Sequence, residues 1–111
     1  METSQLLKGV LDLAVLAVLD EEDGYGYDIV RRLREAGLDE VGDASVYGTL
    51  RRLFQGGALT SYVVPSEEGP HRKYYGLNER GREQLAEMTK AWRAFADTLD
   101  RLTRHEPEEA A

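Results

Sequence analysis

Apolar positions in the first third of the chain predict two helices. The first extends from a cap at Ser4 to about Leu19, and apolar residues cover nearly all of its circumference. A helix that is apolar on most sides is usually buried from more than one direction, which in a short chain points to a partner subunit. The second spans about residues 25–36, carries one apolar stripe and ends at Gly37, a residue suited to the left-handed stop position.

A third helix is predicted over about residues 44–55, with Asp43 as its cap. Helical spacing gives it a core-facing stripe made of Val46, Leu50, Leu53 and Phe54. The side chains that we assign to its polar face, opposite or beside that stripe, are Ser45, Tyr47, Gly48, Thr49, Arg51 and Arg52.

The pattern then changes from helical to alternating. Residues 59–64 and 71–77 are rich in β-branched and aromatic side chains and are separated by a turn-rich segment, residues 65–70, so they predict a hairpin. The returning strand opens with a basic cluster of His71, Arg72 and Lys73.

A long last helix is predicted over about residues 79–104, with Asn78 as its cap. Its apolar residues follow alternating steps of three and four, the spacing of a heptad seam between helices. These residues are Leu85, Met88, Trp92, Phe95, Leu99 and Leu102. The last residues, 105–111, are expected to be disordered.

Three helices, a hairpin and a long helix form the element order of a winged helix-turn-helix protein. We therefore predict a mainly α (α+β) fold, with a winged helix-turn-helix domain over residues 4–77 and a dimerisation helix over residues 78–104. In this arrangement the third helix can enter a DNA major groove. The hairpin can reach the flanking backbone.

The net charge of -7 changes this picture less than its size suggests. Seven of the 21 acidic residues lie in residues 20–23 and in the C-terminal tail, and the other 14 balance the 14 basic residues. Between Ser45 and Tyr75, four bases outnumber two acids. A local basic surface of this kind is compatible with DNA binding, although it predicts modest non-specific affinity.

The location expected for the protein is the cytoplasm. The chain has no cysteine, which excludes disulfides and thiolate metal sites and favours an intracellular protein. The first residues lack the basic region of a signal peptide. The apolar run over residues 10–19 is too short to span a bilayer, so no membrane association is expected.

The polar face of the third helix and the basic cluster of the hairpin are the candidate DNA contacts. Hydroxyls of Ser45, Tyr47 and Thr49 can reach base edges or phosphates, and Arg51 or Arg52 can bind phosphate or guanine. Gly48 allows close approach, and the basic cluster is placed for phosphates. An ordinary solvated helix face and a charged strand edge explain the same residues equally simply.

Catalysis finds little support in the sequence. The two histidines lie far apart, and no nucleophile stands beside a base. Residues 24–26 lack the pattern of a phosphate-binding loop. We expect no catalytic residue, no metal and no cofactor.

Four segments at consistent spacings resemble the PadR family of transcriptional regulators, especially its short members with a single C-terminal helix. They are the second-helix opening (residues 24–29), the third helix (45–53), the exit into the hairpin (56–59), and the return strand (72–77) followed by Gly81. The chain departs from the family pattern at several positions. Ser45 and Val46 stand where the family usually has threonine and leucine, which keeps the chemistry. Gly48 stands where the family usually has proline, and Asn78 stands where it usually has a threonine cap.

The resemblance implies a homodimer that recognises an inverted-repeat operator in double-stranded DNA. Its first and last helices would form the interface, through Leu6, Val10 and the heptad seam. Members of the family often act as repressors, and small aromatic or cationic ligands relieve repression in several. In the short multidrug-sensing members, a tryptophan of the last helix lines a pore at the dimer centre.

Trp92 matches that tryptophan, which implies a planar aromatic ligand at Trp92, Phe95 and Met88. Packing in a dimer interface is the simpler interpretation of the same seam. An acidic partner for a cationic ligand is expected one turn further along, where this chain has Ala96. Two other functions also stay open. They are a regulator that binds DNA without a ligand and a winged-helix module that binds another protein.

Overall fold

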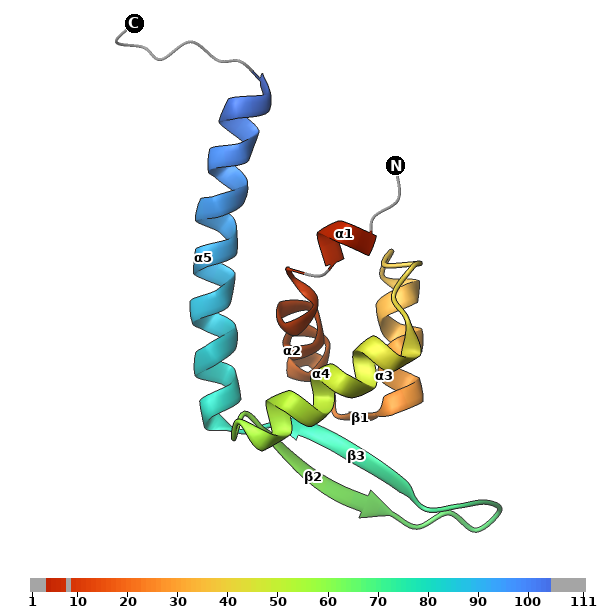
Figure 1. Ribbon diagram of the computed structural model, residues 1–111. Helices are drawn as coiled ribbons and strands as arrows, with labels where there is room; N and C mark the ends of the chain where they lie inside the picture. Colours follow the sequence, from red (N-terminus) through yellow and green to blue (C-terminus); the bar gives the residue numbers. More distant parts are fainter. Residues whose placement is uncertain (1–3, 8, 105–111) are drawn as a thin grey trace, which may run out of the picture.

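The computed structural model describes residues 4–7 and 9–104, which form five helices and three strands (Figure 1). The helices are α1 (Ser4–Leu7), α2 (Leu11–Glu21), α3 (Gly26–Glu35), α4 (Asp43–Gln55) and α5 (Glu79–Arg104). The strands are β1 (Gly24–Tyr25), β2 (Leu59–Val64) and β3 (Arg72–Leu77). This is the predicted α+β fold, with the winged helix-turn-helix order and a long last helix.

Helix α2 lies at the centre of the hydrophobic core. Its Val15 and Leu16 are fully buried, and α2 contacts α3, α4, β3 and α5. The largest fully buried side chains of α3 and α4 pack in the same core. They are Ile29, Val30 and Leu33 of α3 and Val46 and Leu50 of α4. The apolar circumference of α2 is thus explained largely by its own chain, which packs around it.

The first helix differs from the prediction. In place of one helix to Leu19, the structure has α1 and α2, separated around Gly9. A Cβ on Gly9 would meet nothing within 4 Å, so tight packing does not require a glycine there. A glycine weakens a helix at its position, because its backbone loses more conformational freedom on folding than that of any other residue.

The other helix ends test local predictions. Gly37 has a positive φ of 119°, as predicted for a helix stop. Asn78 caps α5, since its Oδ1 accepts a hydrogen bond from the backbone N–H of Gly81 at 2.8 Å. Asp43 is not a cap, because it is the first residue of α4 and its side chain binds Arg34 at 2.9 Å.

The sheet contains one strand that the sequence pattern did not predict. Strand β3 lies between β2 and the two-residue β1, and both pairings are antiparallel. Residues Tyr25, Tyr74 and Tyr62 therefore stand side by side on one face, with ring centroids 5.4 and 5.7 Å apart. The β2–β3 hairpin, hereafter the wing, projects beyond the helices (Figure 1).

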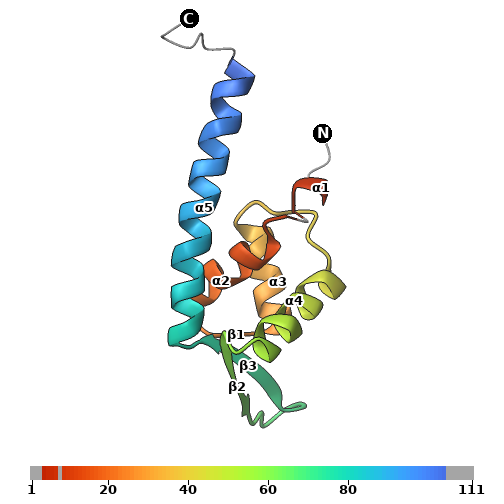
Figure 2. The same cartoon turned by 60° about the vertical axis from the view of Figure 1, so that its left-hand side comes forward.

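Helix α5 runs from the base of the wing along α2 and continues past the other helices (Figures 1 and 2). Leu85 and Met88, in its first half, pack against the core of their own chain. None of the helices in the described part is long and apolar enough to cross a membrane. The predicted disordered tail, residues 105–111, lies outside the described residues.

Candidate nucleic-acid interface

Four of the six predicted contact residues lie on the outward face of α4, and none of the four makes a hydrogen bond or ion pair with another element of the described part. Ser45, Tyr47 and Arg51 are exposed, and Arg51 makes no ion pair with any described residue. Above Gly48 there is open space, because a Cβ there would meet nothing within 4 Å. This stretch of α4 can therefore approach a large, flat partner closely.

Thr49 does not lie on that face, contrary to the prediction. Its side chain is 3% exposed, and its hydroxyl accepts a hydrogen bond from Arg52 at 3.3 Å. The position follows from helical spacing, since residue 49 stands three residues after Val46 and one before Leu50, both in the core. We therefore remove Thr49 from the set of candidate DNA contacts.

Arg52 is engaged by a helix distant in sequence. Its guanidinium contacts the carboxylate of Asp12 on α2, with Nη2 3.1 Å from Oδ1. The side chain is exposed at the rim of α4, but its charge already has a partner.

Phe54 also differs from the prediction, which placed it in the core. It is 41% exposed and lies at the end of α4, with its ring edge-on to Tyr75 at 6.5 Å. The ammonium of Lys73 lies 5.5 Å from the Phe54 ring and 5.6 Å from the Tyr75 ring, within the range of cation–π attraction. The exposed Phe54 ring therefore attracts the ammonium group of Lys73 on the wing.

Tyr47 is held against the start of α3. A Cβ added to Gly26 would overlap the Tyr47 ring, so the ring occupies the space that a side chain at residue 26 would need. Tyr47 is still 41% exposed. Its hydroxyphenyl group is therefore fixed on one side and open on the other.

The basic cluster of the wing divides between the two faces of the hairpin, because consecutive residues of a strand point to opposite faces. Lys73 faces α4, whereas the guanidinium of Arg72 stacks 4.5 Å above the ring of Tyr25. All three residues, His71, Arg72 and Lys73, are exposed. Neither Arg72 nor Lys73 forms an ion pair with another described residue.

Two grooves join the exposed face of α4 to the wing. One of about 400 Å³ lies between α4 and the wing and is lined by Tyr47, Arg51, Phe54, Gln55, Lys73 and Tyr75. A smaller groove of about 260 Å³ lies where β1, α3 and the wing meet. Arg72 and Lys73 give it positive charge, and Tyr47 contributes an aromatic ring. The exposed face of α4 and the wing cations therefore form one continuous surface.

The wing is fastened to the helices at one further point. The hydroxyl of Tyr62 on β2 donates a 2.6 Å hydrogen bond to the carboxylate of Asp23, just after α2. This bond raises the pKa of Tyr62, since losing the proton would place two negative charges together. Gly76 leaves the room for the Asp23 carboxylate, which a Cβ there would crowd at 2.5 Å.

A third groove, which is apolar, lies between the first two helices and α5. Its volume is about 580 Å³, and it is lined by Leu6, Gly9, Val10, Leu13, Met88, Ala91, Trp92, Phe95 and Leu99. Trp92 is 42% exposed and Phe95 59% exposed, with ring centroids 6.4 Å apart. Most residues of the two predicted sets, for dimerisation and for ligand binding, line this groove.

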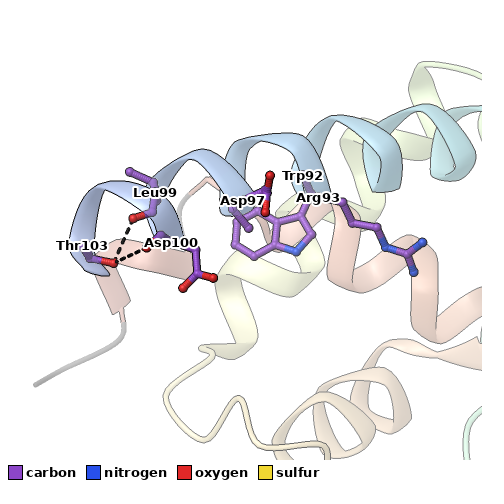
Figure 3. A pocket seen from close by; sticks show the side chains of 7 residues that line it. Trp92, Arg93, Asp97, Leu99, Asp100 and Thr103 are labelled. Carbon is purple, nitrogen blue, oxygen red and sulfur yellow. Dashed lines mark hydrogen bonds between the residues drawn. The ribbon is translucent and has the colours of Figure 1, made fainter. Parts of the chain in front are cut away.

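The other side of the Trp92 indole belongs to a shallower pocket of about 560 Å³ along α5 (Figure 3). Asp97 and Asp100 line it together with Trp92 and Arg93. Ala96 has no carboxylate, and the two carboxylates of this pocket, Asp97 and Asp100, are paired with Arg101 at 3.9 Å and Arg104 at 3.1 Å. Among the described residues, no group of three or more acidic or histidine side chains could hold a metal ion.

Three positions that shape the candidate interface were not found from the sequence. They are Gly26, which makes room for Tyr47, and Asp12 and Asp23, which hold Arg52 and the wing. Each of these three residues lies at least 21 positions along the chain from the residue that it contacts, so no local sequence motif reveals the contact.

Comparison with known proteins gives the chain relatives over nearly its whole length. Residues 15–87 match the family model described as the Transcriptional regulator PadR-like family. A PadR-like transcriptional regulator from Bacillus cereus is 34% identical, covers 93% of this chain and 100% of its own, and has a TM-score of 0.81. A Streptococcus transcriptional regulator is 33% identical, with 90% and 98% covered and a TM-score of 0.78.

A structure of Bacillus subtilis PadR in complex with operator DNA shares the fold. It is 24% identical, the matched region covers 72% of this chain and 46% of that one, and the TM-score is 0.66. The family model matches about two thirds of the chain, and the predicted motifs fall at the corresponding places of the observed fold. The chain therefore belongs to the PadR-like family of transcriptional regulators.

Proposed function

We propose that this regulator, which by its family is not an enzyme, binds an inverted-repeat operator as a homodimer and represses transcription in the cytoplasm. The observation that carries the DNA-binding part is the continuous surface of α4 and the wing. It presents the Ser45 and Tyr47 hydroxyls beside three cations, Arg51, Arg72 and Lys73, none of them paired with a described carboxylate.

The two parts of this surface correspond to the two kinds of contact that a DNA-binding protein makes, with bases and with phosphates. Ser45, Tyr47 and Arg51 of α4 are exposed and would meet base edges, and Gly48 would let the helix backbone come close. The wing cations are placed for phosphates, which fix register and orientation. Family membership, and a fold shared with a PadR that was solved with operator DNA, support the same reading.

The test is a gel shift with the DNA upstream of the protein's own gene. We expect specific binding, and we expect the double substitution Arg72→Ala/Lys73→Ala to weaken it at least ten-fold. The control Lys90→Ala/Arg101→Ala removes the same charge from α5 and should leave binding nearly unchanged. Binding that survives loss of the two wing cations would contradict the wing assignment. Absence of any operator binding would favour a protein-interaction module.

We further propose that a planar aromatic ligand at Trp92 relieves repression. The apolar groove exposes Trp92 and Phe95 side by side, and its volume lies within the range of small-molecule sites. In a dimer, the grooves of two copies would adjoin along the seam of α5. Asp97 and Asp100 line the neighbouring pocket but are paired with Arg101 and Arg104, and Arg93 lines it too, so the proposal concerns the aromatic ring of the ligand and not its charge.

Fluorescence of Trp92, the only tryptophan, reports on this directly. We expect a planar aromatic compound to quench it and to release operator DNA over the same concentration range. A saturated ring of equal size serves as the matched control and should bind more weakly. If no compound of a broad aromatic panel quenches Trp92, the sensing role is wrong, while DNA binding is untouched.

A further inference from the structure

We infer that Arg52, although it is a cation on the DNA-reading helix, acts as a positioning residue that fixes α4 to α2 through Asp12. The inference rests on the proposed DNA binding and assigns Arg52 a role that the sequence pattern does not. Arg51, its neighbour, remains the DNA-contacting cation of α4.

The hydrogen bonds of the Arg52 guanidinium support this assignment. Nη1 lies 3.4 and 3.3 Å from the two carboxylate oxygens of Asp12, and Nη2 lies 3.1 Å from Oδ1. Nη2 also donates to the Thr49 hydroxyl at 3.3 Å. An arginine that bridges a carboxylate and a buried hydroxyl has its planar donor fork fixed by both partners.

The place of these contacts in the fold gives them their effect. Asp12 and Arg52 are 40 residues apart, and their contact joins the central helix of the core to the reading helix. Thr49 is buried one turn before Arg52, so the guanidinium lies along the flank of α4 that faces α2. Because Arg51 has no such partner among the described residues, the two adjacent arginines differ in role.

A substitution at Asp12 separates the two possible roles by the sign of its effect. If Arg52 bound phosphate, Asp12 would compete for it, and Asp12→Asn would strengthen DNA binding by freeing Arg52 and removing a negative charge. If Arg52 positions α4, Asp12→Asn weakens binding in spite of the more favourable net charge. We expect a loss of about three-fold, the scale of an exposed ion pair.

The salt dependence of binding provides a second readout. Each phosphate that a cation neutralises adds about 0.9 to the slope of log affinity against log salt. Arg51→Gln should therefore lower the slope by about one for each protomer. Arg52→Gln should weaken binding by a similar factor to Asp12→Asn and leave the slope unchanged.

The experiment is fluorescence anisotropy of a labelled operator duplex over a salt series, using the full chain. Asp20→Asn is the matched control for Asp12→Asn, since Asp20 lies on the same helix and has no side-chain partner among the described residues. It should raise affinity slightly. The exchange Asp12→Arg/Arg52→Asp restores the pair with reversed charges and should recover most of the affinity, and circular dichroism melts confirm that each variant is folded.

Two results would overturn the inference. One is tighter binding by Asp12→Asn, and the other is a slope for Arg52→Gln that falls as it does for Arg51→Gln. Either would leave the proposed function standing, because the unmodified protein still binds. Failure of the unmodified protein to bind its operator would instead refute the function itself.

Discussion

At the residue scale, single side chains fix the ends of helices and the contacts between them. Asn78 was predicted as a cap because the capping bond spans three residues. Thr49 was assigned to the face of α4 opposite the core, whereas its position three residues after the buried Val46 places it inward. The Asp12 partner of Arg52 depends on how α2 packs against α4, which no motif reveals.

The cap of α5 gives a stability prediction. Asn78→Ala removes the acceptor for the Gly81 N–H and the donor to the Gly57 carbonyl, and should lower the free energy of unfolding by about 1 kcal/mol. Asn78→Asp keeps the acceptor and should recover much of the loss. Urea unfolding measures both, and equal stability of the alanine variant would contradict the capping role.

The Tyr62–Asp23 bond gives a prediction for alkaline pH. Since the bond raises the pKa of Tyr62, its contribution to stability is complete below the ordinary value of 10.0 and is lost as the pH rises through the higher folded value. In a titration of tyrosinate absorbance, Tyr62→Phe should remove a late-ionising group. Asp23→Asn should shift that group earlier. An unchanged late phase in Asp23→Asn would assign it to another tyrosine.

At the scale of elements, hydrophobic period predicted α3 and α4 because each buries a regular stripe, whereas the hairpin was predicted from its β-branched and aromatic residues around a turn-rich segment and is mostly exposed. The two-residue β1 is too short to carry a period, and it exists only because β3 pairs with it. The predicted core position of Phe54 failed for a related reason, since at the end of α4 the wing, not the core, supplies its neighbours.

Core and wing positions should differ sharply in their cost on substitution. Leu50 of α4 is 1% exposed, so Leu50→Ala should cost about 2–5 kcal/mol through lost burial and a cavity. Val63 on β2 is 60% exposed, and Val63→Ala should change stability by no more than about 0.5 kcal/mol. Denaturant unfolding checks both, and comparable losses would mean that the wing is buried in solution.

At the scale of the whole molecule, α2 links the apolar groove to the candidate DNA surface. Leu13 lines the groove beside Trp92, and the adjacent Asp12 holds Arg52 of the reading helix. At the other end of α2, the Val18 carbonyl accepts a 2.6 Å bond from Arg32. Any movement of α2 caused by a ligand would therefore reach α3 and α4 through these contacts.

The exposed seam of α5 predicts the oligomeric state. Leu99 and Leu102 are 43% and 64% exposed on a helix that extends past its own core, as expected of a surface that meets a second copy. We expect a mass of about 25 kDa by sedimentation, twice the 12.5 kDa of one chain. Leu99→Glu/Leu102→Glu should yield monomers and lose operator binding, and a dimer that persists in this variant would place the interface elsewhere.

The packing of the Tyr47 ring against Gly26 has a consequence for how such a regulator can evolve. The two positions share one volume, so a side chain at residue 26 requires the Tyr47 ring to turn away or residue 47 to be smaller. A side chain gained at residue 26 therefore changes where the Tyr47 ring points on the recognition helix. A change of operator preference can begin at either position, and the two positions should covary among relatives.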